Sequence, residues 1–196
     1  MTRVRLHEGP VLAISAALAI AVVALVCVWW SGGRESGVRA AIRFTARTSF
    51  ALFALAYSAS ALDQLIPHAF TRWQRRNRRY LGLAFAASHF VHAGAIGALG
   101  LWHAPALREH MRHTNIVPGL IAYLFIAAMA ATSFDRSARA IGPRAWSWLH
   151  AIGGFYLWVS FLKSFGSRIA ISPLYSVPVL VLMAIMALRL VSKVSH

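Results

Sequence analysis

Acidic residues and cysteine are both scarce in this chain of 196 residues. It has five Asp and Glu residues against twenty Lys and Arg, and its single cysteine is Cys27. One cysteine excludes a disulfide within the chain and a metal site built from several thiolates. The few acidic residues lie near the ends of apolar runs, which argues against a transporter or channel with a carboxylate-lined path.

Hydrophobic residues make up 59% of the chain, and its mean hydropathy is +0.61. A soluble domain is normally about half apolar, so the composition predicts a membrane protein. In a soluble protein, the net charge of +15 would suggest a nucleic-acid partner. Here the arginines cluster at the ends of apolar runs, so we interpret them as topology signals and contacts to anionic lipids. We expect no nucleic-acid partner.

Six apolar segments are long enough to cross a lipid bilayer as helices, which takes about 20 residues each. More of the basic residues fall on the side that holds both termini, so the positive-inside rule places both termini in the cytoplasm. We predict an all-α membrane protein, a six-transmembrane-helix bundle forming a single transmembrane domain over residues 1–196. Its expected location is the cell inner (plasma) membrane, as a multi-pass protein. The segments are approximately 10–30, 45–66, 80–102, 116–133, 146–165 and 173–191.

Three histidines occur inside these segments. His89 and His92 are one turn apart on the same face of the 80–102 helix. At membrane depth a histidine has lost water and needs a partner, which is either a neighbouring helix or a metal. His150 occurs in the 146–165 segment, and Gly153 and Gly154 follow it. These glycines remove side-chain bulk where a flat group could lie.

The predicted topology makes the 80–102 and 146–165 helices run in the same direction, from inside to outside. Two parallel helices that each supply a histidine are a familiar way to hold a b-type haem. Counted from the arginines before each segment at 1.5 Å per residue, His89 lies roughly 6 Å and His92 roughly 10 Å deeper than His150. Depth alone therefore favours His89 as the partner of His150.

Charged residues elsewhere allow further expectations. Arg43 and Arg47 share a helix face and either reach toward lipid headgroups or hold a buried anionic group. Asp63 is expected to face the arginine cluster between residues 72 and 79. Segment 103–115 is expected to be a solvated loop, although His110 and His113 within it could share a surface metal.

Several short motifs occur in a distinctive order. They are Arg43 to Thr48, Arg78 to Leu83 with an apolar run ending at His92, Thr132-Ser133, Ile141 to Trp146, and Leu149-His150. Together they resemble the ferric reductase-like transmembrane domain family over about residues 40–165. The resemblance is nearest to the bacterial haem b membrane subunits that serve a periplasmic methionine sulfoxide reductase. The membrane domains of NADPH oxidases are more distant relatives.

The resemblance implies a bundle that passes electrons across the membrane through one or two b haems. His92 matches the helix-three ligand and His150 the first helix-five ligand, so family register favours His92, with His89 as the alternative ligand. The family usually has a second helix-five histidine, but Lys163 stands there in this chain. We expect Lys163 to salt-bridge a haem propionate or to face water, and therefore one haem rather than two. The other residues predicted to border the cofactor are Arg47, Gly153 and Gly154.

We therefore expect a haem b-containing electron-transfer protein, which would be the membrane subunit of an oxidoreductase without catalytic residues of its own. Little chain follows the last apolar segment, so the electrons are expected to come from quinol or a separate flavoprotein. The outer acceptor could be a periplasmic partner protein, a metal ion or oxygen. The alternative is a non-enzymatic membrane protein that retains the fold with reduced or lost haem binding, because the second helix-five histidine is missing.

Overall fold

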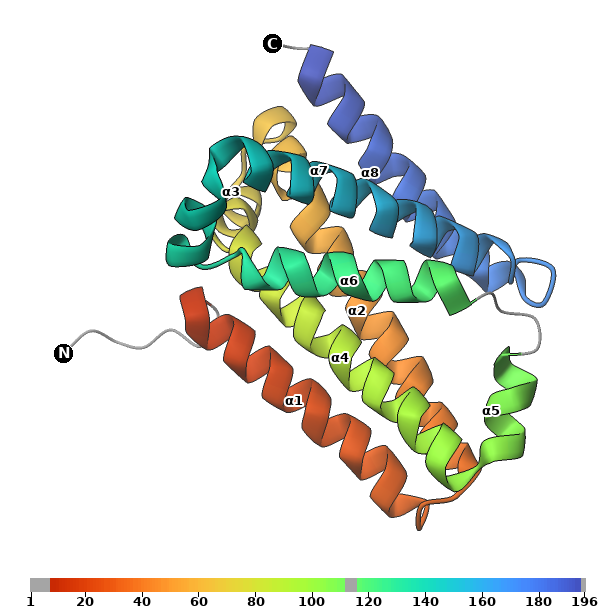
Figure 1. Cartoon of the computed structure of the whole chain (residues 1–196). Coiled ribbons are helices and arrows are strands. Elements are labelled where there is room, and N and C mark those ends of the chain that lie inside the picture. The colour runs from red at the N-terminus through yellow and green to blue at the C-terminus, as the bar shows by residue number, and fades with distance from the viewer. Residues whose placement is uncertain (1–7, 112–115, 195–196) are drawn as a thin grey trace. The chain divides into compact units, whose positions relative to one another are not determined.

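The computed structural model describes residues 8–111 and 116–194, apart from the side chain of His110 (Figure 1). Within these ranges all regular structure is helical and no strand occurs, which confirms the predicted all-α class. His113 lies outside the described residues. The helices are α1 (Gly9–Trp30), α2 (Glu35–Leu65), α3 (Ala69–Arg76), α4 (Arg78–Trp102), α5 (Ala104–Met111), α6 (Ile116–Ala131), α7 (Asp135–Gly166), the 3-10 helix η1 (Pro173–Tyr175) and α8 (Ser176–Val194).

Among the described residues, three stretches are long and apolar enough to cross a membrane: α1, α4, and η1 with α8. The helices α6 and α7 meet at a bend of 115° and add a fourth if together they form one broken span. These helices support the predicted membrane protein. A bundle of six separate spans, and the side on which each terminus lies, stay predictions.

The second helix begins earlier than predicted, at Glu35 instead of residue 45. Its first turns carry an ion pair between Arg39 Nε and Glu35 Oε1 at 2.6 Å. They also bury Val38 and Ile42 against residues of α4 and α5. The predicted boundary followed the start of the apolar run, whereas burial of residues four positions apart extends the helix ahead of that run.

Two of the connections between the predicted segments contain short helices. The helix α3 begins after His68, which caps it: the backbone N–H of Phe70 donates to His68 Nδ1 at 3.3 Å. The helix α5 lies in segment 103–115, so the prediction of a loop there was wrong over residues 104–111. Burial of Ala106 in an apolar cluster holds α5 in place.

The helix α7 has an additional part ahead of the fifth predicted helix, and this part starts at Asp135. Its first part ends at Gly142, whose φ of 78° and ψ of 162° break the helical geometry. A positive φ at this position favours glycine, and Pro143 cannot donate a backbone hydrogen bond to continue the first part. The second part of α7 contains the predicted 146–165 helix.

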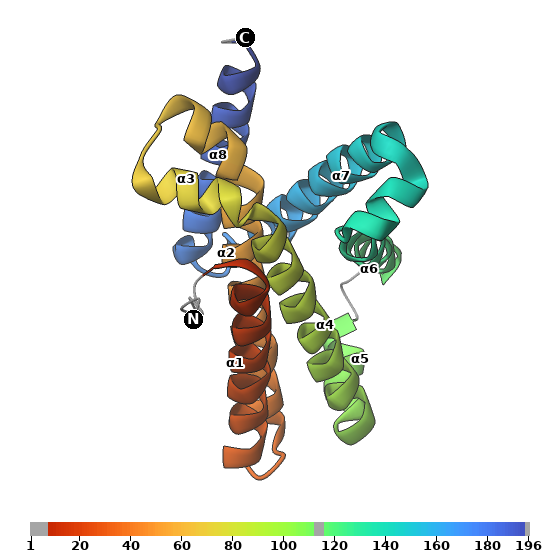
Figure 2. The same cartoon turned by 90° about the vertical axis from the view of Figure 1, so that its left-hand side faces the viewer.

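The chain divides into two compact units, residues 1–53 with 80–116, and residues 54–79 with 117–196. In the first unit α1, the first half of α2 and most of α4 run alongside one another (Figures 1 and 2). Val38, Ile42 and Leu99 form the centre of its apolar core. In the second unit α7 packs on α8, where the indole N–H of Trp158 donates to the carbonyl of Leu182 at 2.9 Å.

Candidate functional site

A buried row of hydroxyl groups joins α2 to α4 in the first unit. Thr45, Ser49 and Ser88 are each 0% exposed. Ser49 Oγ donates to Ser88 Oγ at 2.9 Å, and Thr48 Oγ1 lies 3.1 Å from the same atom. On α2, Thr48 and Ser49 follow Thr45 by three and four residues, which places all three on one helix face.

His92 lies one turn after Ser88 and continues this row. Its Nδ1 atom lies 3.0 Å from Thr45 Oγ1 and 3.1 Å from the carbonyl oxygen of Ile42. The Thr45 hydroxyl donates to the carbonyl of Ala41 at 2.7 Å, so its oxygen is an acceptor for His92. With two acceptors beside Nδ1, the proton of a neutral imidazole belongs on Nδ1, and the lone pair belongs on Nε2.

His89 lies one turn before His92 and is partly buried. Its ring centroid is 5.5 Å from that of His92 and 5.4 Å from that of Phe85. The two imidazoles therefore occupy one side of α4, as their spacing predicts. Phe85 in turn contacts Phe53 of α2, with 5.6 Å between ring centroids, so an apolar contact flanks the polar row.

His150 lies in the second unit and stacks on Trp146, with 4.2 Å between ring centroids. Its Nε2 atom is 3.3 Å from the hydroxyl oxygen of Thr132. The indole N–H of Trp146 donates to the carbonyl of Thr132 at 3.0 Å. Trp146 and His150 thus both contact Thr132, and the three residues come from separate motifs of the sequence resemblance.

The predicted ligands are divided between the two units. His89 and His92 belong to the first unit and His150 to the second. Each has hydrogen-bonding or ring partners inside its own unit, as given above. Joint ligation of one iron by His92 and His150 stays a prediction. In the described residues no three His, Cys, Asp or Glu side chains gather as a metal site, but a haem iron held by two imidazoles needs no such group.

Gly153 and Gly154 both face neighbouring protein. A Cβ atom on Gly153 would lie 2.6 Å from Met129 Sδ, and one on Gly154 would lie 2.9 Å from Tyr57 Cε2. Close helix packing against α6 and α2 therefore accounts for the two glycines. Their place beside a haem stays a prediction.

The charged residues predicted near the cofactor are on the surface. Arg43 and Arg47 are exposed on α2, as arginines that reach toward a polar boundary would be. Lys163 is exposed in the last turn of α7. Whether Lys163 faces water or pairs with a haem propionate stays a prediction.

Some residues at the site were not predicted to belong to it. Ser88 and Ser49 were overlooked, and Thr45 and Thr132 were noted only as parts of motifs. The signal available for Ser88 was its spacing of four from His92, which puts both on one face. His103 directly follows α4, and its Nε2 atom lies 2.9 Å from the carbonyl oxygen of Gly33, so it connects the end of α4 to the turn after α1.

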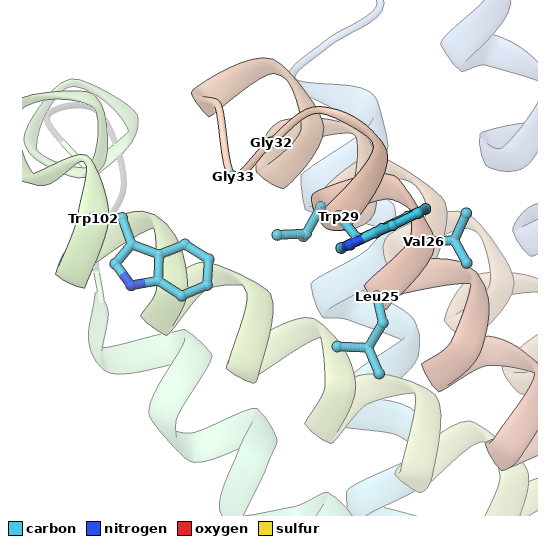
Figure 3. Close-up of a pocket in the computed structure, with 7 residues that line it drawn as sticks. Leu25, Val26, Trp29, Gly32, Gly33 and Trp102 are labelled. Carbon is cyan, nitrogen blue, oxygen red and sulfur yellow. The ribbon is translucent and has the colours of Figure 1, made fainter.

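A separate hollow of about 750 Å³ lies in the first unit between α1 and the end of α4 (Figure 3). Trp29 lies on one side of it and Trp102 on the other. Its lining contains no ionisable side chain and none of the predicted site residues. The full lining is Leu25, Val26, Val28, Trp29, Gly32, Gly33 and Trp102.

Comparisons with models of known protein families, with curated proteins and with solved structures found no match.

Proposed function

We propose that this chain is a haem b-containing protein that transfers electrons across a membrane. The electrons would come from quinol or a separate flavoprotein and reach an acceptor on the outer side. The observation that carries the proposal is the pair of contacts at His92, where Nδ1 lies against the carbonyl of Ile42 and the hydroxyl of Thr45. Histidines that bind metals usually donate their other ring N–H to such a group, which fixes the ring and its tautomer.

The residues present fit a haem ligand at this position. His92 is partly buried on an apolar helix, and its Nε2 atom carries the lone pair that iron would accept. When bound, a b haem supplies one-electron redox chemistry. The contacts at Nδ1 favour His92 as the ligand, as family register does, and His89 stays the alternative on the basis of depth.

The second ligand in this proposal is His150. It is the histidine of α7, and its ring is positioned by Trp146 and Thr132. The proposal includes six membrane spans with both termini in the cytoplasm of the inner membrane. Lys163 faces water in this arrangement, so about one haem is expected per chain.

Purified protein tests the proposal directly. Expression with ample haem, followed by a pyridine haemochrome assay and a reduced-minus-oxidised spectrum, should give about one b haem per chain. The variant His150→Ala should lose most of it, because α7 has no other histidine. A wild-type protein that folds but holds no haem would refute the function, and full occupancy in His150→Ala would remove His150 as a ligand.

A second candidate is a membrane protein that keeps this fold with reduced or lost haem binding. The observation that favours it is the filled space beside Gly153 and Gly154, where Met129 and Tyr57 make close contact. The exposed Lys163, which stands where the resembled family has a histidine, also favours this candidate. The haemochrome assay distinguishes the two candidates, since the second predicts far less than one haem per chain.

A further inference from the structure

Two arginines from different helices reach the same side of α2 in the second unit. Arg78, the first residue of α4, donates from Nη1 to the Ser60 hydroxyl at 2.7 Å. Arg189 of α8 donates from Nη1 to the carbonyl of Tyr57 at 2.8 Å. Its guanidinium carbon also lies 4.0 Å from the centroid of the Tyr57 ring. Because Tyr57 and Ser60 are three residues apart, the two guanidinium groups approach one face of the helix.

A third arginine, Arg75 of α3, lies beside them. Its Nη1 atom forms an ion pair with Asp63 Oδ2 at 3.0 Å, which confirms that Asp63 faces the arginine cluster. The helix α3 is fixed in this position by the fully buried Gln74, whose Nε2 atom donates to the carbonyl of Leu55 at 2.7 Å. The other oxygen of Asp63 is buried and accepts no hydrogen bond from the described residues.

The cluster therefore has more positive than negative charge. Arg78 lies close enough to both Arg75 and Arg189 for each of them to repel its guanidinium group. Within the described part of the chain, Arg75 is the only one of these three that pairs with a carboxylate. Like charges held together raise the free energy of the folded state, and an anion bound between them removes that cost.

We propose that Arg78 and Arg189, with Arg75 beside them, form a binding site for a phosphate group at the end of α2. Guanidinium groups bind phosphate through paired N–H donors, and they keep their charge when partly buried. Basic pockets between membrane helices hold the headgroups of anionic phospholipids in this way. This site is independent of the proposed haem function, since none of its three arginines is a proposed ligand.

The test compares lipid binding to purified protein in detergent, with phosphatidylglycerol as the anionic probe and phosphatidylcholine as the neutral one. Retained lipids are counted by native mass spectrometry. Wild-type protein should retain phosphatidylglycerol in preference to phosphatidylcholine. The affinity should fall about fivefold in Arg78→Gln or Arg189→Gln and about twenty-fivefold in the double variant, as expected when one or two charge-assisted contacts to the bound phosphate are lost.

A matched control is Arg139→Gln, which removes the same charge from an exposed position on α7. It should change the affinity by less than about twofold. Arg189→Gln also removes the contact to Tyr57, so each variant is checked by circular dichroism. If a glutamine variant does not fold, Arg78→Lys and Arg189→Lys take its place, and they should bind more weakly because lysine lacks the planar fork.

Soluble glycerol 3-phosphate and inorganic phosphate identify the source of the phosphate group. If either displaces phosphatidylglycerol from wild type but not from the double variant, the natural ligand is a soluble phosphate compound at this same site. If neither does, the ligand is a lipid headgroup. Equal retention of phosphatidylglycerol by wild type, the double variant and Arg139→Gln would overturn the site. So would a double variant that keeps its lipid but loses haem, because the arginines would then serve a haem propionate.

Discussion

Thr45 and His92 join α2 to α4, with 3.0 Å between the threonine hydroxyl oxygen and the Nδ1 atom of the imidazole. Both residues belong to the same compact unit, and Thr45 is fully buried. The contact holds one ring nitrogen of His92 against α2 and so fixes the direction of the other. Thr45 is thus a positioning residue in the proposed haem site.

The first prediction concerns this contact. The variant Thr45→Val keeps the shape of the side chain but removes the hydroxyl, so the His92 ring is less well oriented. Haem affinity should fall about tenfold or more, as it does when outer partners of metal-binding histidines are removed. Haem retention after purification, measured by pyridine haemochrome, checks the fall, and Thr45→Ser should restore binding.

The matched control for Thr45 is Thr48→Val, which removes a hydroxyl that bonds to Ser88 and not to His92. It deletes the same atoms one turn away in the same helix. Equal haem loss in the two valine variants would mean that the hydroxyl row acts only through general packing. The positioning role of Thr45 would then be wrong.

The second prediction separates the two histidines of α4. His92→Ala should lose most of the haem, because His92 has the contacts at Nδ1 that orient a ligand. His89→Ala should keep more of it. Absorption spectra of both variants, with occupancy normalised to protein, give the comparison. If the larger loss instead comes from His89→Ala, depth matching is the correct guide and family register is not.

The long apolar helices were predictable because their signal is local. The run of apolar residues ending at Trp30 predicts a helix over 10–30, and α1 spans Gly9–Trp30. A second apolar run begins at Tyr80, directly after Arg78 and Arg79. The helix α4 begins at Arg78, close to the predicted residue 80. Length and composition determine such helices, so no knowledge of their neighbours is needed.

The short polar helices could not be predicted in this way. The helix α3 has little apolar surface, and it is held by contacts such as that between Gln74 and the carbonyl of Leu55, nineteen residues earlier. The same limit applies to the candidate site. His92 stood out by residue type, but its partner Ile42 is fifty residues away in the sequence. The spacing of residues along one helix does not predict a contact between residues so far apart in the sequence.

The third prediction concerns the packing of Gly154. A methyl group added by Gly154→Ala would lie 2.9 Å from Tyr57 Cε2, and that ring is held by Arg189. At Gly153 the nearest atom is the thioether sulfur of Met129, which belongs to a flexible side chain. Both substitutions should lower stability, by about 1–3 kcal/mol for Gly154→Ala and by less for Gly153→Ala. Melting temperatures in detergent measure the difference.

Gly166 on the same helix provides the control, since a Cβ atom there would have no neighbour within 4 Å. Gly166→Ala should leave the melting temperature unchanged or raise it slightly, because alanine restricts the unfolded chain. A Gly154→Ala protein as stable as Gly166→Ala would show that Tyr57 moves freely. Helix packing would then no longer explain Gly154, and room for a flat cofactor would be the better account.

The last prediction concerns Lys163, which stands where the resembled family has a histidine and is exposed in the last turn of α7. An exposed side chain in the last turn of a helix is directed away from a buried haem iron, so we expect Lys163 not to ligate it. Lys163→Ala should therefore leave the haem spectrum and the content of about one haem per chain unchanged. Lys163→His restores the family's ligand type at the same exposed position, and it should also keep about one haem. A gain toward two haems in Lys163→His would show that a second site persists and lacks only its ligand. A change of spectrum in Lys163→Ala would show instead that the lysine itself binds iron, against its exposed position.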